Sequence, residues 1–378
     1  MPGDGFGQAF RVTTFGESHG AALGAVVEGC PPGLPLTEED LQVDLDRRRP
    51  GTGRHVSQRR ESDRVRILSG VYEGHTTGTA IGLLVANEDA RPADYGALAE
   101  VFRPGHADYT YLMKYGRRDP RGGGRASARE TVMRVAAGGI ARRLLETLCG
   151  VRITGWLAEL GPWRHEGPPP ERSPENLFFV ADDSACLLLE TYLDEVRRAR
   201  DSVGARVGVC ARGVPPGWGD PVFDRLDALI AHALMSIGAV KAVEIGDGVG
   251  VVRQRGSEHR DAMSPAGFAS NHAGGIEGGM TNGMPVIVRG AMKPIPTLLR
   301  PLPSVDLETM LPVEAHVERS DVEAVAAARV VAEAMVAITL ADAYLDKFGG
   351  DGVDETRRAW DSYVDRLEAR HLWRRSSR

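Results

Sequence analysis

Lysine is scarce in this chain, and two features that mark membrane and secreted proteins are missing. Only four of its 46 basic residues are lysines, so the other 42 are arginines. No run of about 18 apolar residues occurs, which argues against a membrane-spanning helix. The N-terminal MPGDGFGQAF has neither the basic region nor the apolar stretch of a secretory signal. We therefore expect a cytoplasmic protein without a membrane partner.

Cysteine is also rare, and no two cysteines have the C-x-x-C spacing of a metal site. The chain has four cysteines: Cys30, Cys149, Cys186 and Cys210. Four cysteines in 378 residues do not form a disulfide framework. We expect them to pack as small apolar side chains, and we expect no metal.

The formal net charge of −6 argues against extensive nucleic-acid binding, and the chain has no Walker lysine motif. Hydrophobic residues make up 42% of the chain and charged residues 26%, which is typical of a globular protein with a large core. Genome base composition accounts for much of the arginine excess. Arginines clustered in loops remain informative, because the guanidinium fork matches phosphate and carboxylate groups.

Hydrophobic periodicity predicts a mixture of strands and helices. FRVTTF and AALGAVVEG are typical of strands, and Thr37 is a predicted N-cap for the helix TEEDLQVDLDRR. Strands are also expected within 64–74 and 78–87, and further helices within 127–148, 182–201, 222–234 and 322–347. A long irregular connection is expected over 87–124, and loops of that length are usually functional or disordered.

Two distant segments resemble each other. AALGAVVEGCPPG (21–33) aligns without gaps on ARVGVCARGVPPG (205–217), and six of the thirteen positions are identical. A helix-like segment follows each copy. Chance similarity in a glycine-rich chain is the alternative, but we favour two similar halves in one continuous body. The mixed elements then predict an α+β fold built in layers.

The segment FGESHGAALG contains the spacing G-x-S-x-G around Ser18. In serine hydrolases this spacing marks a nucleophile on a turn between a strand and a helix. Here the segment that follows Gly20 reads as a strand, so a nucleophilic Ser18 is disfavoured. The neighbouring His19, flanked by glycine, is the better candidate for proton transfer.

Arginines and a second histidine recur in other glycine- and proline-rich segments. RPGHAD contains Arg103 and His106, and GGGRASARE contains Arg125, Ser127 and Arg129. Ser127 could serve only as a helix N-cap, or the helix entrance and its arginines could bind an anion. A third cluster, RRRPGTGR, contributes Arg47, Arg48, Arg49 and Arg54. Three such clusters predict a ligand with several negative charges.

Glycine-rich segments in the last third could admit a flat ligand. GDGVGV (246–251) is a poor dinucleotide fingerprint, because it lacks the third glycine spacing and a following helix. NHAGGIEGGMTNGM (271–284) permits close backbone approach, and MKPIPT (292–297) supplies a cation and a hydroxyl beside two prolines. These residues indicate an enzyme acting on an anionic substrate, with a planar cofactor possible, but they do not identify the reaction.

Taken in order, GESHG-AALGAVVEG-CPPG, RPGHAD, GRASARET, GGIEGGMTNG–MKPIPT and ERSD resemble the chorismate synthase family over about 7–347. The resemblance implies an internally duplicated β-α-β sandwich, conversion of 5-enolpyruvylshikimate 3-phosphate to chorismate and phosphate, and a need for reduced FMN without net redox change. It also implies a homotetramer. We expect one domain over 1–348 and a charged, helical C-terminal extension over 349–378.

The resemblance also implies roles for individual residues. His19 would assist phosphate departure, His106 would serve protonation of the reduced flavin, and Asp321 would help the flavin act as a base. Substrate anions would be held by Arg48, Arg54, Arg103 and Arg129, although the family also associates the first two positions with NADP. FMN contacts would come from Arg125, Ala126, Ser127, Gly238, Ala239, Gly278, Lys293, Pro294, Ile295, Pro296, Thr297 and Arg319.

Three positions depart from the family pattern. Gly238 stands where many relatives have asparagine, and Val322 and Glu323 follow Asp321 where relatives often have proline and a small residue. Two rival functions remain: a flavin- or nicotinamide-dependent oxidoreductase, and a phospho-ligand-binding module without turnover. Because no dinucleotide fingerprint or extra reductase segment is visible, we expect an external flavin reductase to supply electrons, with NADPH only an indirect source.

Overall fold

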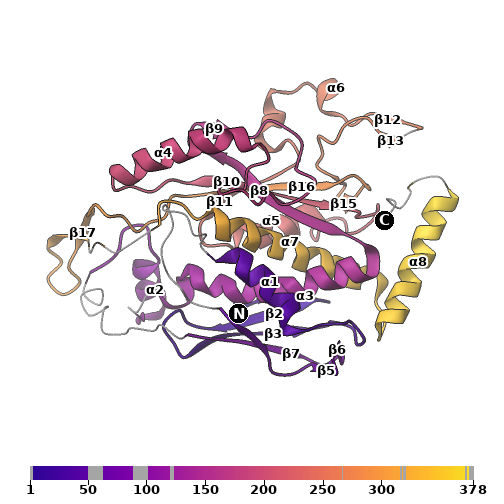
Figure 1. Ribbon diagram of the computed structural model, residues 1–378, viewed down its shortest axis with the longest axis horizontal. Coiled ribbons are helices and arrows are strands. Elements are labelled where there is room, and N and C mark those ends of the chain that lie inside the picture. The colour runs from indigo at the N-terminus through magenta and orange to yellow at the C-terminus, as the bar shows by residue number, and fades with distance from the viewer. Residues whose placement is uncertain are drawn as a thin grey trace.

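The computed structural model describes residues 3–49, 63–87, 101–119, 123–265, 267–315, 317, 321–370 and 373. Helices lie between two five-stranded sheets, as Figure 1 shows with the first sheet at the bottom and the second at the top. This arrangement confirms the expected α+β sandwich. Within the described part of the chain, no helix is both long and apolar enough to cross a membrane.

The first sheet comes from the N-terminal part of the chain. Its strands are β1 (Gly5–Phe6), β2 (Arg11–Gly16), β3 (Ala22–Glu28), β4 (Val65–Ile67) and β7 (Ile81–Ala86). They pair antiparallel in the order β1-β2-β3-β7-β4. Alternate residues of β3, namely Leu23, Ala25 and Val27, are fully buried. One face of this sheet therefore packs against the helices.

The second sheet repeats this plan. Its strands are β8 (Arg152–Leu160), β9 (Trp163–Arg164), β10 (Ala205–Arg212), β11 (Val240–Ile245) and β16 (Val286–Met292). They pair antiparallel in the order β11-β16-β10-β8-β9. The two segments that resemble each other in sequence form β3 and β10, and each is the central strand of its sheet.

Four helices fill the space between the sheets: α1 (Glu38–Arg48), α3 (Thr131–Cys149), α5 (Leu226–Met235) and α7 (Val325–Phe348). Thr37 and Asp40 form a capping box at the start of α1, as the sequence predicts. Helices α3 and α7 pack closely, because a Cβ atom on Gly138 would lie only 2.4 Å from Ala334 Cβ. Glycine at this position permits the close approach.

Hydrogen bonds of two turns confirm the duplication. In the first half, Thr76 Oγ1 donates to Pro31 O at 2.6 Å and accepts from Leu34 N at 3.0 Å. In the second half, Thr281 Oγ1 donates to Pro215 O at 2.6 Å and accepts from Trp218 N at 2.9 Å. Gly33 and Gly217, which end the two Pro-Pro-Gly sequences, both have φ of 90°.

A cross-strand pair is repeated as well. Gly24 on β3 lies opposite Phe15, and Gly208 on β10 lies opposite Trp156. A Cβ atom on either glycine would approach the facing ring to 2.2 or 2.3 Å. Both glycines thus make room for an aromatic ring on the neighbouring strand, so their identity in the sequence alignment has a common structural cause.

The prediction of an irregular connection over 87–124 is wrong in its middle. Helix α2 (Asp108–Tyr115) lies there, and it ends at Gly116 in the left-handed conformation with φ of 66°. The sequence DYTYLMKY contains no proline or glycine that would break a helix. Residues 88–100 and 120–122 of the same connection lie outside the described residues.

The remaining elements are short, apart from two helices. Helix α4 (Cys186–Arg198) precedes β10, and α8 (Val353–Ala369) follows α7. The others are β5 (Val71–Tyr72), β6 (His75–Thr76), η2 (Gly124–Ala126), η3 (Ala128–Glu130), η4 (Asp183–Ala185), η5 (Gly248–Arg253), α6 (Gly256–His259), β12 (Met263–Ser264), β13 (Gly267–Phe268), β14 (Ile276–Glu277), β15 (Met280–Thr281), β17 (Pro303–Val305) and β18 (Pro312–Glu314).

Helix α8 contacts the Pro-Pro-Gly turns of both halves. Val353 N, at its start, donates to Pro32 O at 3.2 Å, and Tyr363 Oη donates to Pro216 O at 2.7 Å. Between these contacts Trp360 is buried, with its ring 6.0 Å from that of Trp218. The C-terminal helix is therefore packed onto the main body.

Candidate active site

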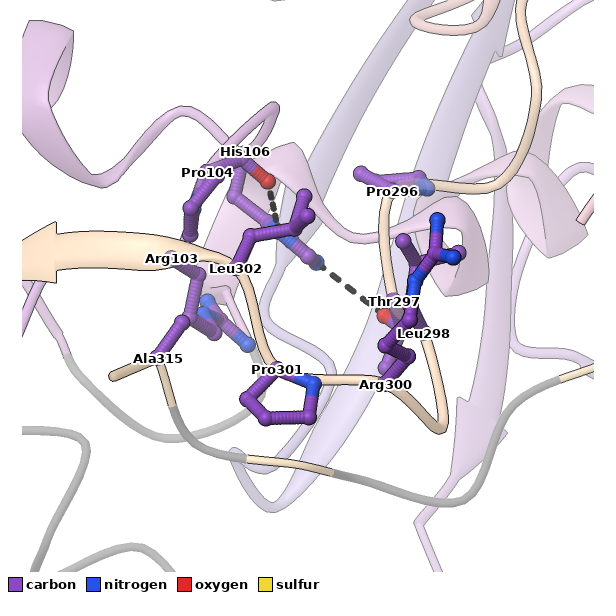
Figure 2. Close-up of a pocket in the computed structure, with 10 residues that line it drawn as sticks. All are labelled: Arg103, Pro104, His106, Pro296, Thr297, Leu298, Arg300, Pro301, Leu302 and Ala315. Carbon is purple, nitrogen blue, oxygen red and sulfur yellow. Dashed lines mark hydrogen bonds between the residues drawn. The ribbon is translucent and has the colours of Figure 1, made fainter. Parts of the chain in front are cut away.

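One pocket lies between two loops that the sequence singles out. The RPGHAD segment and the loop after β16 line it, together with Ala315: Arg103, Pro104, His106, Pro296, Thr297, Leu298, Arg300, Pro301 and Leu302 (Figure 2). Apolar walls with two arginines suit a ligand that is partly flat and apolar and partly anionic.

Direct contacts hold the two loops together. Lys293 Nζ donates to Gly105 O at 2.6 Å, and Thr297 Oγ1 lies 3.3 Å from His106 Nε2. Gly105 has φ of 75°, and a Cβ atom there would lie 3.0 Å from Pro296. On the other side of this loop, Ser202 Oγ donates to Ile295 O at 2.6 Å. The predicted residues His106 and Lys293 to Thr297 are thus brought together.

The pKa values of His106 and Lys293 are both lowered. Burial lowers the pKa of His106, and the charges of Arg103 and Lys293 lower it further. The Pro104 carbonyl and the Asp108 carboxylate act in the opposite direction. Burial also lowers the pKa of Lys293, with an added contribution from the charge of Lys241. A proton on His106 is therefore held weakly, which suits an acid that must release it.

Arg103 is buried and faces an acid of its own segment. Its Nε and Nη2 atoms each lie 2.9 Å from a carboxylate oxygen of Asp108, and its backbone N–H donates to the same carboxylate. Arg118 Nη1 lies 3.4 Å from Asp108 as well. The hydrogen bonds and charge of Arg103 lower the pKa of Asp108 against the effect of burial. The Arg103–Asp108 pair therefore holds the RPGHAD loop in shape.

The GESHG loop connects β2 and β3, so a strand follows Gly20 as the sequence predicts. A nucleophile elbow is thereby excluded on geometry, and Ser18 is buried. Asn87, at the end of β7, donates to Glu17 O at 3.0 Å and to Gly20 O at 2.8 Å. These two hydrogen bonds hold the loop in place on either side of His19.

Asn87 also connects that loop to a buried cluster of arginines. Its Oδ1 accepts from Arg129 Nε at 2.9 Å, and Arg129 Nη1 lies 2.7 Å from Asp63 Oδ1. Arg48, in the last turn of α1, approaches the other oxygen of Asp63 at 3.4 Å and donates to Thr131 Oγ1 at 3.1 Å. Two of the predicted substrate arginines thus flank one carboxylate.

The GGGRASARE segment joins this cluster to the pocket. Ser127 Oγ accepts from Arg129 N, so Ser127 caps the turn η3 just before α3. Arg125 extends toward β2, where Nη2 donates to Thr14 Oγ1 at 2.8 Å and to Asp4 at 2.8 Å. A Cβ atom on Gly123 would lie 3.5 Å from Arg103 Nη2 and 3.8 Å from Ser127 N. The two groups of predicted residues therefore meet at Gly123.

Asp321 lies near the pocket loop, because the backbone of its neighbour Val322 is bonded to the segment that holds Ile295. Val203 N donates to Val322 O at 3.0 Å, and the adjacent Ser202 holds Ile295. The departure Glu323 is buried, and its carboxylate accepts from Val325 N at the start of α7. Burial raises the pKa of Glu323 to about 7; the Val325 bond opposes this shift and the charge of Asp321 adds to it.

The other predicted cofactor positions lie in two separate places, one beside the pocket loop and one in the β14–β15 hairpin. Ala239 O accepts from Lys293 N at 2.9 Å, which places Gly238 and Ala239 beside the pocket loop. Gly278 lies in the β14–β15 hairpin, whose Gly279 O accepts from Leu226 N at the opposite end of α5. The ten residues of α5 span about 15 Å, so Gly278 is separated from Gly238 within one chain. Arg54 and Arg319 lie outside the described residues.

Sequence reasoning missed Asp63, Asn87 and Asp108, the polar residues that orient the predicted arginines. Two of the three have a recognisable signal: Asn87 directly follows a strand, and Asp108 is part of the RPGHAD segment. Asp63 had no such signal beyond its acidic side chain in a basic loop. Among the described residues, no group of three metal-ligating side chains could hold an ion.

Comparisons with known proteins agree with this geometry. The family model for chorismate synthase matches residues 10–345. A solved structure titled "Crystal Structure of Chorismate Synthase" is 35% identical, covers 96% of this chain and 99% of its own, and has a TM-score of 0.77. The chain therefore belongs to the chorismate synthase family, carbon–oxygen lyases that convert 5-enolpyruvylshikimate 3-phosphate to chorismate and phosphate.

Proposed function

We propose that this chain carries out the chorismate synthase reaction between the pocket of His106 and the arginine cluster of Arg129, with reduced FMN as cofactor. The observation that supports this location is that the pocket and the arginine cluster meet at Gly123. A Cβ atom placed on Gly123 would lie within 4 Å of both Arg103 and Ser127. One group offers cations for substrate anions, and the other offers an apolar pocket beside a histidine.

The residues present fit FMN in their chemistry. The prolines and leucines of the pocket offer flat apolar contacts for a ring system, and Arg300 offers positive charge for a phosphate. Lys293 adds a second positive charge beside the pocket, where it bonds to Gly105 O. When bound, reduced FMN would supply electron density that eases loss of phosphate and is recovered as hydrogen leaves. We assign the FMN contacts to Arg125–Ser127, Gly238–Ala239 and Lys293–Thr297, with Arg319 and Gly278 as further candidates.

The protein's own residues would bind, orient and transfer protons. Arg129 and Arg48 would hold substrate carboxylate or phosphate groups, with Asp63 fixing the orientation of both guanidinium groups. Arg103 and Arg54 are the other proposed anion contacts, and Arg48 and Arg54 could serve NADP instead. His19 would give a proton to the departing phosphate, and Asp321 would accept one near the flavin site.

His106 would hold its proton at the edge of the pocket. Its lowered pKa makes the imidazolium a ready donor, and the contact with Thr297 directs Nε2 into the pocket. We further propose that the enzyme is a cytoplasmic homotetramer of 1–348 domains with an added C-terminal helix. We propose that it depends on an external reductase, so that NADPH contributes only indirectly.

An anaerobic assay tests the cofactor proposal. The purified protein is mixed with substrate and chemically reduced FMN, and chorismate is followed by absorbance. We expect many turnovers per FMN without net consumption of reductant. Stoichiometric NADPH oxidation would instead support an oxidoreductase, and substrate binding without turnover would support a binding module.

A further inference from the structure

The neutral form of His106 has a defined tautomer. His106 Nδ1 lies 3.3 Å from Pro104 O, and a backbone carbonyl can only accept a hydrogen bond. Nδ1 therefore carries the hydrogen, which leaves Nε2 as the nitrogen that gains or loses a proton. The group facing Nε2 is Thr297 Oγ1, at 3.3 Å. Figure 2 shows both contacts, with the imidazole lying between the two loops.

Thr297 differs from the other groups around His106 in being able to donate and accept in the same event. A threonine hydroxyl has one proton and two lone pairs. The charged groups around His106 are Arg103 and Asp108 on its own segment and Lys293 and Arg300 on the facing loop. The arginines cannot accept a proton, Lys293 Nζ is bonded to Gly105 O, and Asp108 is engaged by Arg103.

Resting on the function proposed above, we infer that Thr297 is the relay through which His106 exchanges its proton with a molecule in the pocket. In the forward step, the imidazolium N–H at Nε2 transfers its proton to Thr297 Oγ1. The hydroxyl proton of Thr297 passes at the same time to a basic atom of the bound molecule. His106 ends neutral, Thr297 is unchanged, and no electron moves between them.

The surroundings of Thr297 hold this geometry rigidly. Pro296 precedes it and packs against Gly105, while the preceding Ile295 is held by Ser202. Lys293 closes the other side by its bond to Gly105 O. A relay requires its donor and acceptor atoms to stay within hydrogen-bond reach, and these contacts fix both ends.

Thr297→Val removes the hydroxyl while keeping the shape, and Thr297→Ser keeps the hydroxyl. In flavin-free protein labelled at histidine nitrogens, NMR reports the Nε2 shift and the pKa of His106. We expect Thr297→Val to move the Nε2 resonance of the neutral ring toward the value of an unbonded nitrogen. The pKa of His106 should fall further, because a charge-assisted bond to the imidazolium is lost.

With reduced FMN and substrate, Thr297→Val should lower kcat about tenfold or more, with FMN affinity changed less than kcat. Thr297→Ser should recover most of that loss, and Thr110→Val, on the exposed face of α2, serves as the matched control. An Nε2 resonance and a pKa that do not respond to Thr297→Val would overturn the relay, even if the enzyme proved not to use FMN. The relay would also be overturned if Thr297→Ser lost as much kcat as Thr297→Val.

Discussion

The carboxylate of Glu323 accepts a hydrogen bond from the backbone N–H of Val325, the first residue of α7. This side chain therefore satisfies one of the N–H groups left open at the start of the helix. Asp321, four residues before Val325, is the other carboxylate close to this helix start in the sequence. With Glu323 in that role, capping is not needed to account for Asp321.

Asp321→Asn should leave folding intact and slow the reaction. Asparagine caps a helix about as well as aspartate, so the melting temperature should not change. If Asp321 accepts a proton, turnover should fall about 10²-fold, with FMN and substrate still bound. The measurements are thermal unfolding and kcat on the same preparation. Near-normal turnover would remove Asp321 from the proposed chemistry.

Glu323 should make stability depend on pH. The ordinary pKa of a glutamate is 4.5, and burial raises that of Glu323 to about 7. Between these values the unfolded chain releases a proton that the folded chain keeps, so the contribution of Glu323 to stability is present below pH 4.5 and lost as pH rises through about 7. Glu323→Gln keeps an oxygen acceptor for Val325 but cannot ionise.

The difference in free energy of unfolding, Glu323→Gln minus wild type, should therefore be larger at pH 8 than at pH 5, by roughly 1–3 kcal/mol. Denaturant titrations of both proteins at the two pH values measure this difference, because the ionisation of Glu323 is the main titration that distinguishes them. A constant difference between the two proteins would show that Glu323 does not ionise in this range.

His19→Ala and His106→Ala should each lower turnover about 10²-fold or more, as expected for a lost general acid. Substrate affinity should change less, because neither histidine is proposed as an anion contact. His75→Ala, on the exposed β5–β6 hairpin, is the matched control. Saturating reduced FMN is used throughout. Wild-type turnover in both site variants would contradict the assigned roles.

Arg48→Ala and Arg129→Ala should weaken substrate binding by about tenfold or more, since each removes a charged hydrogen-bond donor. Lysine substitutions should recover only part of this, because each guanidinium fork is lost: that of Arg129 spans Asp63 and Asn87, and that of Arg48 spans Asp63 and Thr131. Calorimetry gives the Kd, and Arg66→Ala on the exposed side of β4 is the control. Because each change also leaves the buried Asp63 with fewer partners, circular dichroism must first show a folded protein. Unchanged Kd in both variants would leave NADP binding as the role to test.

Trp360→Ala should destabilise the protein by roughly 3–5 kcal/mol, because it empties a fully packed site between α7 and α8. FMN binding at 10 °C should not change, since α8 contacts the two Pro-Pro-Gly turns and not the pocket. Phe223→Ala removes another aromatic ring, but that ring is 91% exposed, so it should shift stability by less than about 0.5 kcal/mol. Equal stability of the two variants would show that α8 adds little to the fold.

Local sequence signals carried much of the fold. The strand that follows Gly20 and the capped helix after Thr37 were predictable because periodicity and capping act over a few residues. The duplication was visible because the same glycines meet the same geometric need in each half. Helix α2 was missed because its sequence lies between two glycine- and arginine-rich stretches that read as loop.

The proposed site was predictable in its residue types and not in its connections. Arg129 meets Asp63 and Asn87, which are 66 and 42 residues away in the chain. No periodicity specifies such pairs, because they depend on how the end of β7 and the start of α3 lie beside each other. The cap formed by Glu323 is local, two residues from Val325, but the sequence does not reveal which way the carboxylate turns.

The contacts of α8 join the first and last parts of the chain, so they can form only late in translation. Pro32 leaves the ribosome early, yet its partner Val353 is made more than 300 residues later. Gln8 and Phe10 likewise donate to Asp342 near the end of α7. Although domains usually fold as they emerge, the first half of this chain completes its own packing only when the last helix has been translated. A nascent chain arrested before α7 would expose the sides of α1 and α3 and the inner face of the second sheet, against which α7 packs. Chaperones that recognise apolar surface should then bind it.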